Sequence, residues 1–277
     1  MCIPVGTWSH TPVVMMQDVC DRFGLGAVSG CHSVAGGVSN ELYRVDTERG
    51  VFAVKRMVTN AESPRFVTNI EAAYRIEHHA LVSGIPMAAP VPDPDTGRVL
   101  ARVDHSLWRV HRWVNAHPIT TPTLIDAVHV GALLARIHRA GTGVVGGTVR
   151  SHTDLDPKNV LKDRGGRLVA VDWDAAGRIC PQEELVQVAL EWGLRPRRVD
   201  TPAVAAVVTG YRDAGGPALC RPRMELIASW ISGRQEWLAF NQAHQGDTPA
   251  GRAQISEAVA SIGLVTTHAV EICDILR

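Results

Sequence analysis

The chain of 277 residues lacks the features of several protein classes. Its 28 basic residues balance 28 acidic ones, and no segment gathers Lys and Arg into a stripe that could follow nucleic-acid phosphates. Its six cysteines include no C-x-x-C pair, and the chain is far longer than the secreted domains that disulfides stabilise. We therefore expect reduced cysteines, a cytoplasmic protein and no nucleic-acid partner.

Long apolar segments are also missing. Residues 1–10 lack the basic segment and apolar core of a secretory signal. No window approaches the roughly 18 consecutive apolar residues of a membrane-spanning helix. We expect neither export nor a membrane anchor.

Lysine is scarce. The chain has only three lysines, Lys55, Lys158 and Lys162, and every other fixed positive charge is an arginine. A GC-rich genome produces this bias, so a lysine that is retained is a candidate functional residue. For Lys162, which we place in a surface loop, chance retention is the simpler interpretation.

The first predicted elements indicate a small α+β lobe. Over 28–58, alternating apolar positions separated by turn residues predict three strands of an antiparallel sheet. A helix is predicted over 64–84, and two further strands over 98–103 and 107–114. These five strands and one helix form a lobe that we assign to residues 1–113.

The remainder of the chain has the periodicity of helices. Apolar residues recur at helical spacing over 124–139, and most of the chain beyond Pro181 shows the same pattern. Between these segments a short hairpin is predicted, in which 160–162 pairs with 167–171. We assign 114–277 to a larger, mainly helical lobe, so the predicted fold is α+β and two-lobed.

The segment from His152 to Asn159 carries the chemistry. It fits the pattern H-x-D-x-x-x-x-N, and an apolar strand ends in Asp172 thirteen residues after Asn159. A hairpin between these two positions would place an amide and a carboxylate side by side, as oxygen ligands for Mg²⁺. Asp154 would then accept a proton from an incoming hydroxyl. The spacing predicts a base and two metal ligands.

An ordinary polar loop is the alternative interpretation, since so short a pattern recurs by chance in roughly a few per cent of unrelated chains. The loop, the short strand, the Gly turn and the apolar strand ending in Asp all occur in the required order, which weakens that alternative. We assign His152 a structural role in propping the loop.

Lys55 follows the apolar segment 51–54. This context is comparable to the kinase V-A-I-K strand, whose lysine binds nucleotide phosphates and pairs with a helix carboxylate. Glu77 shares the apolar face of the predicted helix and is the favoured partner, while Glu71 remains open. A solvent-facing strand lysine is the alternative for Lys55.

Two glycines lie between the first two predicted strands, in Gly36-Gly37-Val38-Ser39-Asn40. They would let backbone N–H groups or the Ser39 hydroxyl approach nucleotide phosphates without obstruction by a Cβ atom. The segment fits neither the P-loop nor the Rossmann pattern. Hairpins with paired glycines are common, so this signal is weak by itself.

With these residues in hand, the chain resembles the aminoglycoside phosphotransferase and choline kinase superfamily, whose members share the eukaryotic protein-kinase fold. The likeness spans nearly the whole chain. It is most specific at the loop 152–159 and at Asp172-Trp173-Asp174. The family's loop reads H-G-D-x-x-x-x-N, and Thr153 replaces the glycine here without removing a catalytic group.

The resemblance implies ATP as the phosphoryl donor, with GTP not excluded, and Mg²⁺ as the metal. It implies that Ser39 lies at the phosphate loop and that Lys55 and Glu77 form an ion pair. It also implies an inter-lobe hinge in which the backbones of Trp113 and Val114 bind adenine.

The implied activity is phosphoryl transfer to a hydroxyl group of a small molecule. The arginine-rich composition indicates a high-GC bacterium, where such enzymes often confer antibiotic resistance, so we expect an aminoglycoside or another basic antibiotic. A housekeeping kinase for a choline-like, homoserine-like or sugar substrate is one alternative, and a non-catalytic pseudokinase is another. Acidic groups of the helical lobe would favour a cationic substrate. The residues considered for that pocket, but not assigned to it, are Asp174, Glu183, Glu184, Glu191, Trp192, Trp237 and Asn241.

Overall fold

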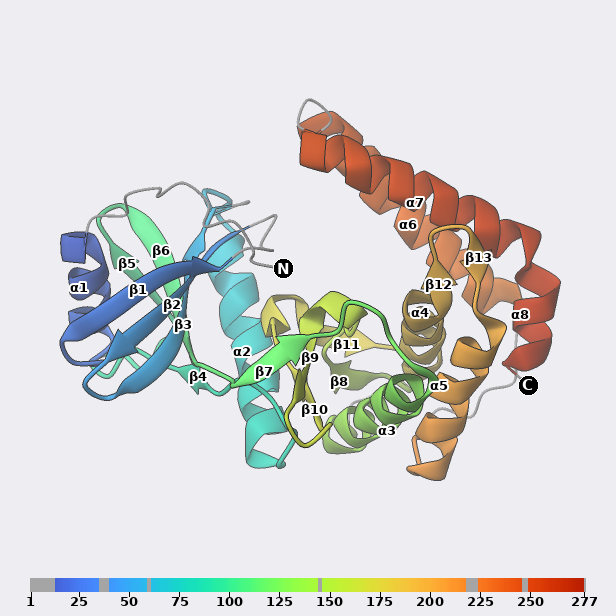
Figure 1. Ribbon diagram of the computed structural model, residues 1–277, viewed down its shortest axis with the longest axis horizontal. Helices are drawn as coiled ribbons and strands as arrows, with labels where there is room; N and C mark the ends of the chain where they lie inside the picture. The colour runs from blue at the N-terminus through green and yellow to red at the C-terminus, as the bar shows by residue number, and fades with distance from the viewer. Residues whose placement is uncertain are drawn as a thin grey trace. The chain divides into compact units, whose positions relative to one another are not determined.

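The chain forms two compact units, which Figure 1 shows in a computed structural model. The first unit contains the described residues of Met1–Glu71 and Ala88–Val114, and the second those of Ala72–Met87 and Asn115–Arg277. Helix α2, Phe66–Val82, contributes to both. The structure describes residues 13–34, 40–58, 61–143, 146–217, 224–245 and 249–276.

The first unit is built on a six-stranded antiparallel sheet. Its order is β1-β2-β3-β6-β4, and β5 also pairs with β6. The five strands predicted from the sequence are all present, and the two-residue strand β4 is an addition. The strands are β1 (Val28–Val34), β2 (Asn40–Thr47), β3 (Gly50–Met57), β4 (Pro90–Val91), β5 (Leu100–Val103) and β6 (Ser106–Arg112).

Helix α1, Val13–Arg22, is missing from our sequence prediction. It buries Met16, Val19 and Cys20 in one cluster with side chains of the sheet, among them Trp108. The spacing of these three residues is that of one helix face, and it is the signal that identifies the helix.

The second unit is mainly helical, as predicted. The predicted helix over 124–139 is confirmed as α3 (Leu124–Ala140). The predicted helical segment beyond Pro181 contains α4 (Pro181–Gly193), α5 (Thr201–Asp213), α6 (Met224–Gln245), α7 (Pro249–Thr267) and α8 (Ala269–Ile275). In Figure 1, α6 and α7 run alongside each other as a long pair.

Helices α3 and α5 pack with their backbones in close contact. A Cβ atom at Gly131 would lie 2.0 Å from the carbonyl oxygen of Val207, and one at Gly210 would lie 2.0 Å from that of Val128. Only glycine leaves room for this approach. These helices form the base on which the loops of the site rest.

Short strands hold the loops of the second unit. The predicted hairpin is confirmed as β9 (Val160–Asp163) and β10 (Leu168–Ala170), and β7 (Ala116–Pro118) pairs with β9. Strand β8 (Val149–Ser151) pairs with β11 (Gly177–Ile179). A last hairpin joins β12 (Leu194–Arg195) to β13 (Arg198–Val199).

None of the described helices alone is both long enough and apolar enough to span a membrane. Gly251–Thr267 and Ala269–Ile275 meet the requirements only as a pair, which is bent by 72°.

Candidate active site

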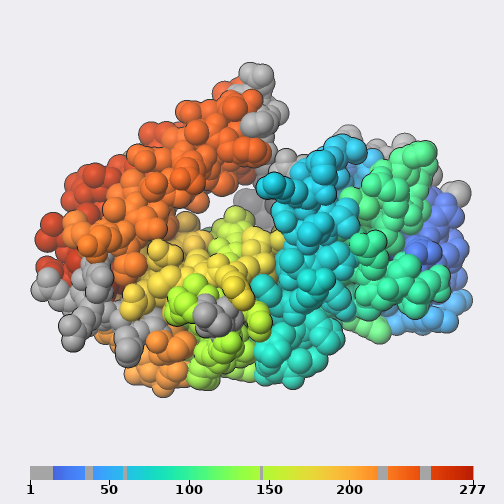
Figure 2. Space-filling model, turned by 180° about the vertical axis from the view of Figure 1, so that it is seen from behind, coloured from blue at the N-terminus to red at the C-terminus, as the bar shows by residue number. Residues whose placement is uncertain are grey.

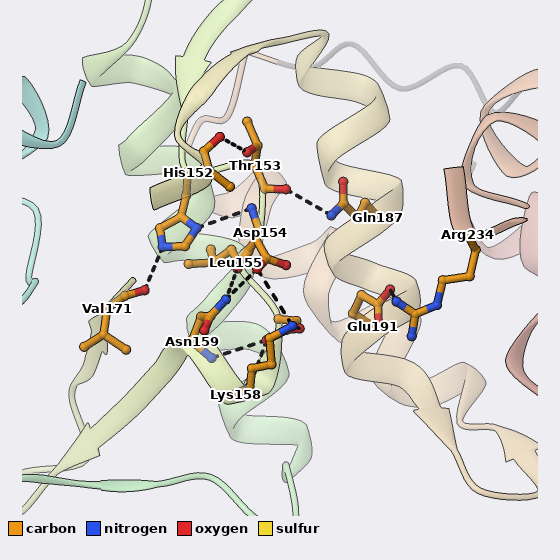
Figure 3. A network of polar contacts seen from close by, with 12 residues as sticks. His152, Thr153, Asp154, Leu155, Lys158, Asn159, Val171, Gln187, Glu191 and Arg234 are labelled. Atoms are coloured by element: carbon orange, nitrogen blue, oxygen red, sulfur yellow. Dashed lines mark hydrogen bonds and ion pairs between the residues drawn. The ribbon is translucent and has the colours of Figure 1, made fainter. Parts of the chain in front are cut away.

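The predicted catalytic loop lies between β8 and β9. A single 3₁₀ turn, Pro157–Asn159, ends the loop. The Asp156 carboxylate caps this turn, accepting hydrogen bonds from the backbone N–H groups of Lys158 at 3.0 Å and Asn159 at 3.3 Å. Proline at the first position supplies a backbone angle suited to the turn. The turn brings Asn159 back toward the start of the loop (Figure 3).

Asp154 and Asn159 are in direct contact. The Asn159 side-chain amide donates to Oδ2 of Asp154 at 2.8 Å and to its carbonyl oxygen at 2.9 Å. Lys158 Nζ lies 3.8 Å from the same Oδ2 and 2.7 Å from the Asp156 carboxylate. The structure thus brings together the two loop residues that the sequence assigns to the site.

The hairpin places Asp172 next to these residues. Val171 donates its backbone N–H to the carbonyl oxygen of Asn159 at 2.9 Å, so the chain returns from β10 directly beside the loop. Asp172 follows in a left-handed conformation, with φ of 61°. The Asp172 charge is one of the causes that raise the pKa of Asp154.

The pKa of Asp154 is raised to about 6. Partial burial, which disfavours the charged form, is the main cause, and the nearby charges of Asp156 and Asp172 act in the same direction. Lys158 and the hydrogen bond from Asn159 oppose the shift without cancelling it. A carboxylate with a pKa moved toward neutrality is typical of a general base.

These residues fit a magnesium ion that also binds phosphates. Both hydrogens of the Asn159 amide point at Asp154, which leaves its oxygen as a ligand, and Asp172 supplies a carboxylate. Within the described ranges no three His, Cys, Asp or Glu side chains form a metal-binding group. Mg²⁺ is usually bound through one or two carboxylates together with substrate phosphates and water.

Thr153 occupies a conformation that favours glycine, with φ of 62°. Its hydroxyl donates to the carbonyl oxygen of Ala175 at 2.6 Å, and its backbone N–H donates to Glu184 Oε1 at 2.7 Å. Its own carbonyl oxygen accepts from the Gln187 side chain at 3.1 Å. Three hydrogen bonds therefore hold a β-branched residue in a left-handed conformation.

Glu184 supports the loop through a hydrogen bond from Thr153, a role that the sequence analysis missed. It is fully buried, and its second oxygen accepts from His138 Nε2 at 2.7 Å, while Tyr211 hydrogen bonds to Nδ1 at 2.7 Å. Burial alone would raise the pKa of Glu184, but hydrogen bonds from His138 and Thr153 keep it lowered. Its helical spacing from the apolar residues Val188 and Trp192, four and eight positions further on, was the available signal.

His152 has the propping role that we predicted. Its Nε2–H donates to the carbonyl oxygen of Val171 at 2.9 Å, and its Nδ1 accepts from the backbone of Asp154 at 3.3 Å. Burial lowers the pKa of His152, which favours the neutral ring. It connects the loop to the segment that carries Asp172.

A cavity of about 1060 Å³ opens beside Asp154, within the second unit. Figure 2 shows a hollow between the orange and red C-terminal helices and the yellow segment of the loop. Of the residues considered for a substrate pocket, Glu183, Glu191 and Trp237 line this cavity. Trp192 belongs to the core instead, where its indole N–H donates to the carbonyl oxygen of Leu155 at 2.9 Å.

Comparison of sequences gives a limited match. No family model matches the chain. A homoserine kinase of Polaromonas naphthalenivorans is 30% identical over 119 residues, which covers 42% of this chain and 35% of that protein. The chain thus aligns with well under two thirds of the relative's length.

Solved structures resemble the chain over most of its length. A microcompartment-associated aminopropanol kinase has a TM-score of 0.67 at 16% identity, with 96% of this chain and 99% of that chain covered. The amicoumacin kinase hAmiN has a TM-score of 0.64 at 13% identity, with 91% of this chain and 93% of that chain covered. The choline kinase LicA of Streptococcus pneumoniae has a TM-score of 0.62 at 14% identity, with 90% of this chain and 99% of that chain covered. This is the fold of the aminoglycoside phosphotransferases and choline kinases. The expected resemblance is confirmed at the level of the fold.

Lys55 and Glu77 are the strand lysine and the helix partner that we predicted for this phosphotransferase fold. Lys55 lies on β3 with 8% of its surface exposed, which disfavours a solvent-facing role. Glu77 is fully buried on α2. Glu71 lies 3.7 Å from Arg98, which gives this carboxylate another partner. The pairing of Lys55 with Glu77 stays a prediction.

The predicted hinge of the phosphotransferase fold follows β6. The backbone N–H of Trp113 donates to the carbonyl oxygen of Val51 at 3.0 Å, so this group is already used within the unit. Adenine recognition by Trp113 and Val114 stays a prediction, and it would use the other backbone groups. Ser39 lies outside the described residues.

Lys162 differs from our expectation of a surface-loop residue. It lies on β9, and its Nζ is 2.5 Å from the carboxylate of Asp126, whose side chain is 1% exposed. Asp126 also forms a capping box with Thr123 at the start of α3. The ion pair ties the hairpin of the site to α3.

Proposed function

We propose that this chain is an ATP- and Mg²⁺-dependent kinase that phosphorylates a hydroxyl group of a small molecule. The main support for this proposal is the position of Asp154. Asn159 orients its carboxylate, which lines a cavity large enough for a drug-sized acceptor. The fold supports the proposal, because the matched structures of this fold are small-molecule kinases.

In the proposed reaction, Asp154 accepts the proton of the acceptor hydroxyl, whose oxygen forms a bond to the γ-phosphorus. The bond between that phosphorus and the bridging oxygen of ADP breaks, and ADP and a phosphate ester are released. Asn159 and Asp172 would hold Mg²⁺, which neutralises charge on the phosphates when it is bound.

Lys55, steadied by Glu77, would position the nucleotide phosphates. The backbones of Trp113 and Val114 would contact adenine, and Ser39 the phosphates. GTP remains open as a donor.

A hydroxylated amine is the acceptor that we favour, and a basic antibiotic such as an aminoglycoside is the first candidate. The size of the cavity and its excess of acidic over basic lining residues support this choice. A homoserine-like acceptor is the second candidate, supported by the partial match to a homoserine kinase.

The experiment is an assay of ADP release with ATP, Mg²⁺ and a panel of aminoglycosides, basic peptide antibiotics, choline, homoserine and sugars. We expect ADP release that depends on one acceptor class, with a product heavier by one phosphoryl group in mass spectrometry. Nucleotide binding without acceptor-dependent ADP release from any class would instead identify a pseudokinase.

A further inference from the structure

Arg234 is held firmly at the wall of the cavity. Its guanidinium carbon lies 5.8 Å from the ring centre of Trp230 and 5.4 Å from that of Trp237, on the same helix, α6. A terminal nitrogen lies 3.5 Å from Glu191 on α4 (Figure 3). Two aromatic faces and a carboxylate leave the guanidinium few orientations, so it is preorganised for a ligand.

The hydrogen bonding of Arg234 is incomplete. Its Nε is buried and has no hydrogen-bond partner among the described residues. A buried guanidinium N–H without an acceptor is unfavourable, because its water has been removed and nothing has replaced it. Because Nε has no exposed surface, a carboxylate in the cavity would accept from the terminal nitrogens of the guanidinium, whose side chain is 26% exposed as a whole.

The other basic residues of the cavity have closer acidic partners. Lys158 lies 2.7 Å from Asp156, and Arg195 lies 3.2 Å from Asp200. The separation of Arg234 from Glu191 is longer than either, and longer than a normal charged hydrogen bond. Arg234 is therefore the basic lining residue best placed to receive an anion.

The cavity also offers places for a cation. Glu183 and Glu257 line it. The ring faces of Trp230 and Trp237 do not offer such a place, because Arg234 already lies over them. An amine would therefore be attracted by carboxylates rather than enclosed by aromatic rings.

We propose that the acceptor is a zwitterion, a hydroxylated compound with an amino group and a carboxylate, and that Arg234 binds the carboxylate. This inference rests on the proposed kinase function. It sets aside the aminoglycosides, which have no carboxylate, and selects the second candidate class, that of hydroxylated amino acids and their short peptides. Glu183 and Glu257 face the amino group, and Asp154 faces the hydroxyl.

Matched ligands test this assignment by binding, which requires no turnover. One pair is L-homoserine and 3-amino-1-propanol, which differ only in the carboxylate. A larger pair is glycyl-L-homoserine and its carboxamide. Calorimetry in the presence of a non-hydrolysable ATP analogue and Mg²⁺ should show the acid of at least one pair binding about 10- to 100-fold more tightly, as expected for hydrogen bonds between charged groups.

Variants assign the preference to Arg234. We expect Arg234→Gln to bring the ratio of affinities, acid over its counterpart without the carboxylate charge, close to one. Arg234→Lys keeps the positive charge but not the planar pair of N–H donors, and should give an intermediate ratio. Arg198→Gln is the control, because Arg198 is an exposed arginine of β13 that does not line the cavity. If Arg234→Gln does not fold, the wild-type pairs and Arg234→Lys still decide.

The outcomes separate this inference from the proposed function. Equal affinity within both pairs, no acid binding, or a preference that persists in Arg234→Gln overturns the zwitterion assignment. ADP release that is equal for acid and amino alcohol also overturns it, while the kinase function stands. Arg234-dependent binding of the acid without any ADP release supports the ligand class and removes the kinase function.

Discussion

The side-chain amide of Asn159 donates to both the carboxylate and the backbone carbonyl of Asp154. One side chain thereby orients the proposed base and directs its own amide oxygen away from Asp154, where it would be available to the proposed magnesium ion. Five positions separate Asp154 from Asn159. Over this interval the 3₁₀ turn at Pro157–Asn159 reverses the chain, so that the two side chains meet. The motif is thus a geometric unit as well as a sequence pattern.

Replacement of Thr153 separates backbone strain from hydrogen bonding. Thr153→Val keeps the branched Cβ at a φ of 62° but loses the hydroxyl that bonds to Ala175, so we expect a loss of about 1–2 kcal/mol in the free energy of unfolding. Thr153→Gly relieves the strain as it loses the same bond, and should stay within about 1 kcal/mol of the wild type. Urea denaturation measures both, and a valine variant as stable as the wild type would refute this explanation.

Asp126 should make stability depend on pH. Burial alone would raise its pKa, but Lys162 and Thr123 outweigh burial and keep the pKa lowered. A carboxyl whose folded pKa is depressed stabilises the protein fully above its unfolded pKa of about 4, and this contribution is lost as the pH falls through the folded pKa.

We therefore expect Asp126→Asn to lower the free energy of unfolding by about 1–3 kcal/mol at pH 7, and the difference from the wild type to shrink below about pH 4. Urea denaturation at a series of pH values provides the measurement. Asp213→Asn, at the exposed end of α5, serves as the control. A difference that stays constant down to pH 2 would argue against a role of the Asp126 charge.

Local spacing accounts for what the sequence could predict. The loop with Asp154 and Asn159 and the hairpin that returns at Asp172 lie within one short segment, so their order alone implies their proximity. Arg234 and Glu184 could not be assigned in this way. Their contacts join α6 to α4 and α4 to the loop, and only tertiary packing determines which face of each helix turns inward.

Close packing of α3 against α5 gives a further prediction. Gly131→Ala would place a methyl group 2.0 Å from the carbonyl oxygen of Val207, so we expect a loss of about 1–3 kcal/mol or more in the free energy of unfolding. Gly263→Ala, on α7, is the matched control, because beyond the adjacent backbone of its own helix no atom lies within 4 Å of its added Cβ. It should gain about 0.5–1 kcal/mol, since alanine favours a helix. Similar effects of the two substitutions in thermal or urea unfolding would show that the helices do not pack this closely.

We propose that Asp154 activates the hydroxyl of the acceptor. The most direct measurement is the turnover of Asp154→Asn, with Asp213→Asn as the control and nucleotide affinity measured in parallel. We predict that kcat falls by about 10²- to 10⁴-fold while the Kd for ATP and Mg²⁺ changes by less than about threefold. A kcat within threefold of the wild-type value would contradict it.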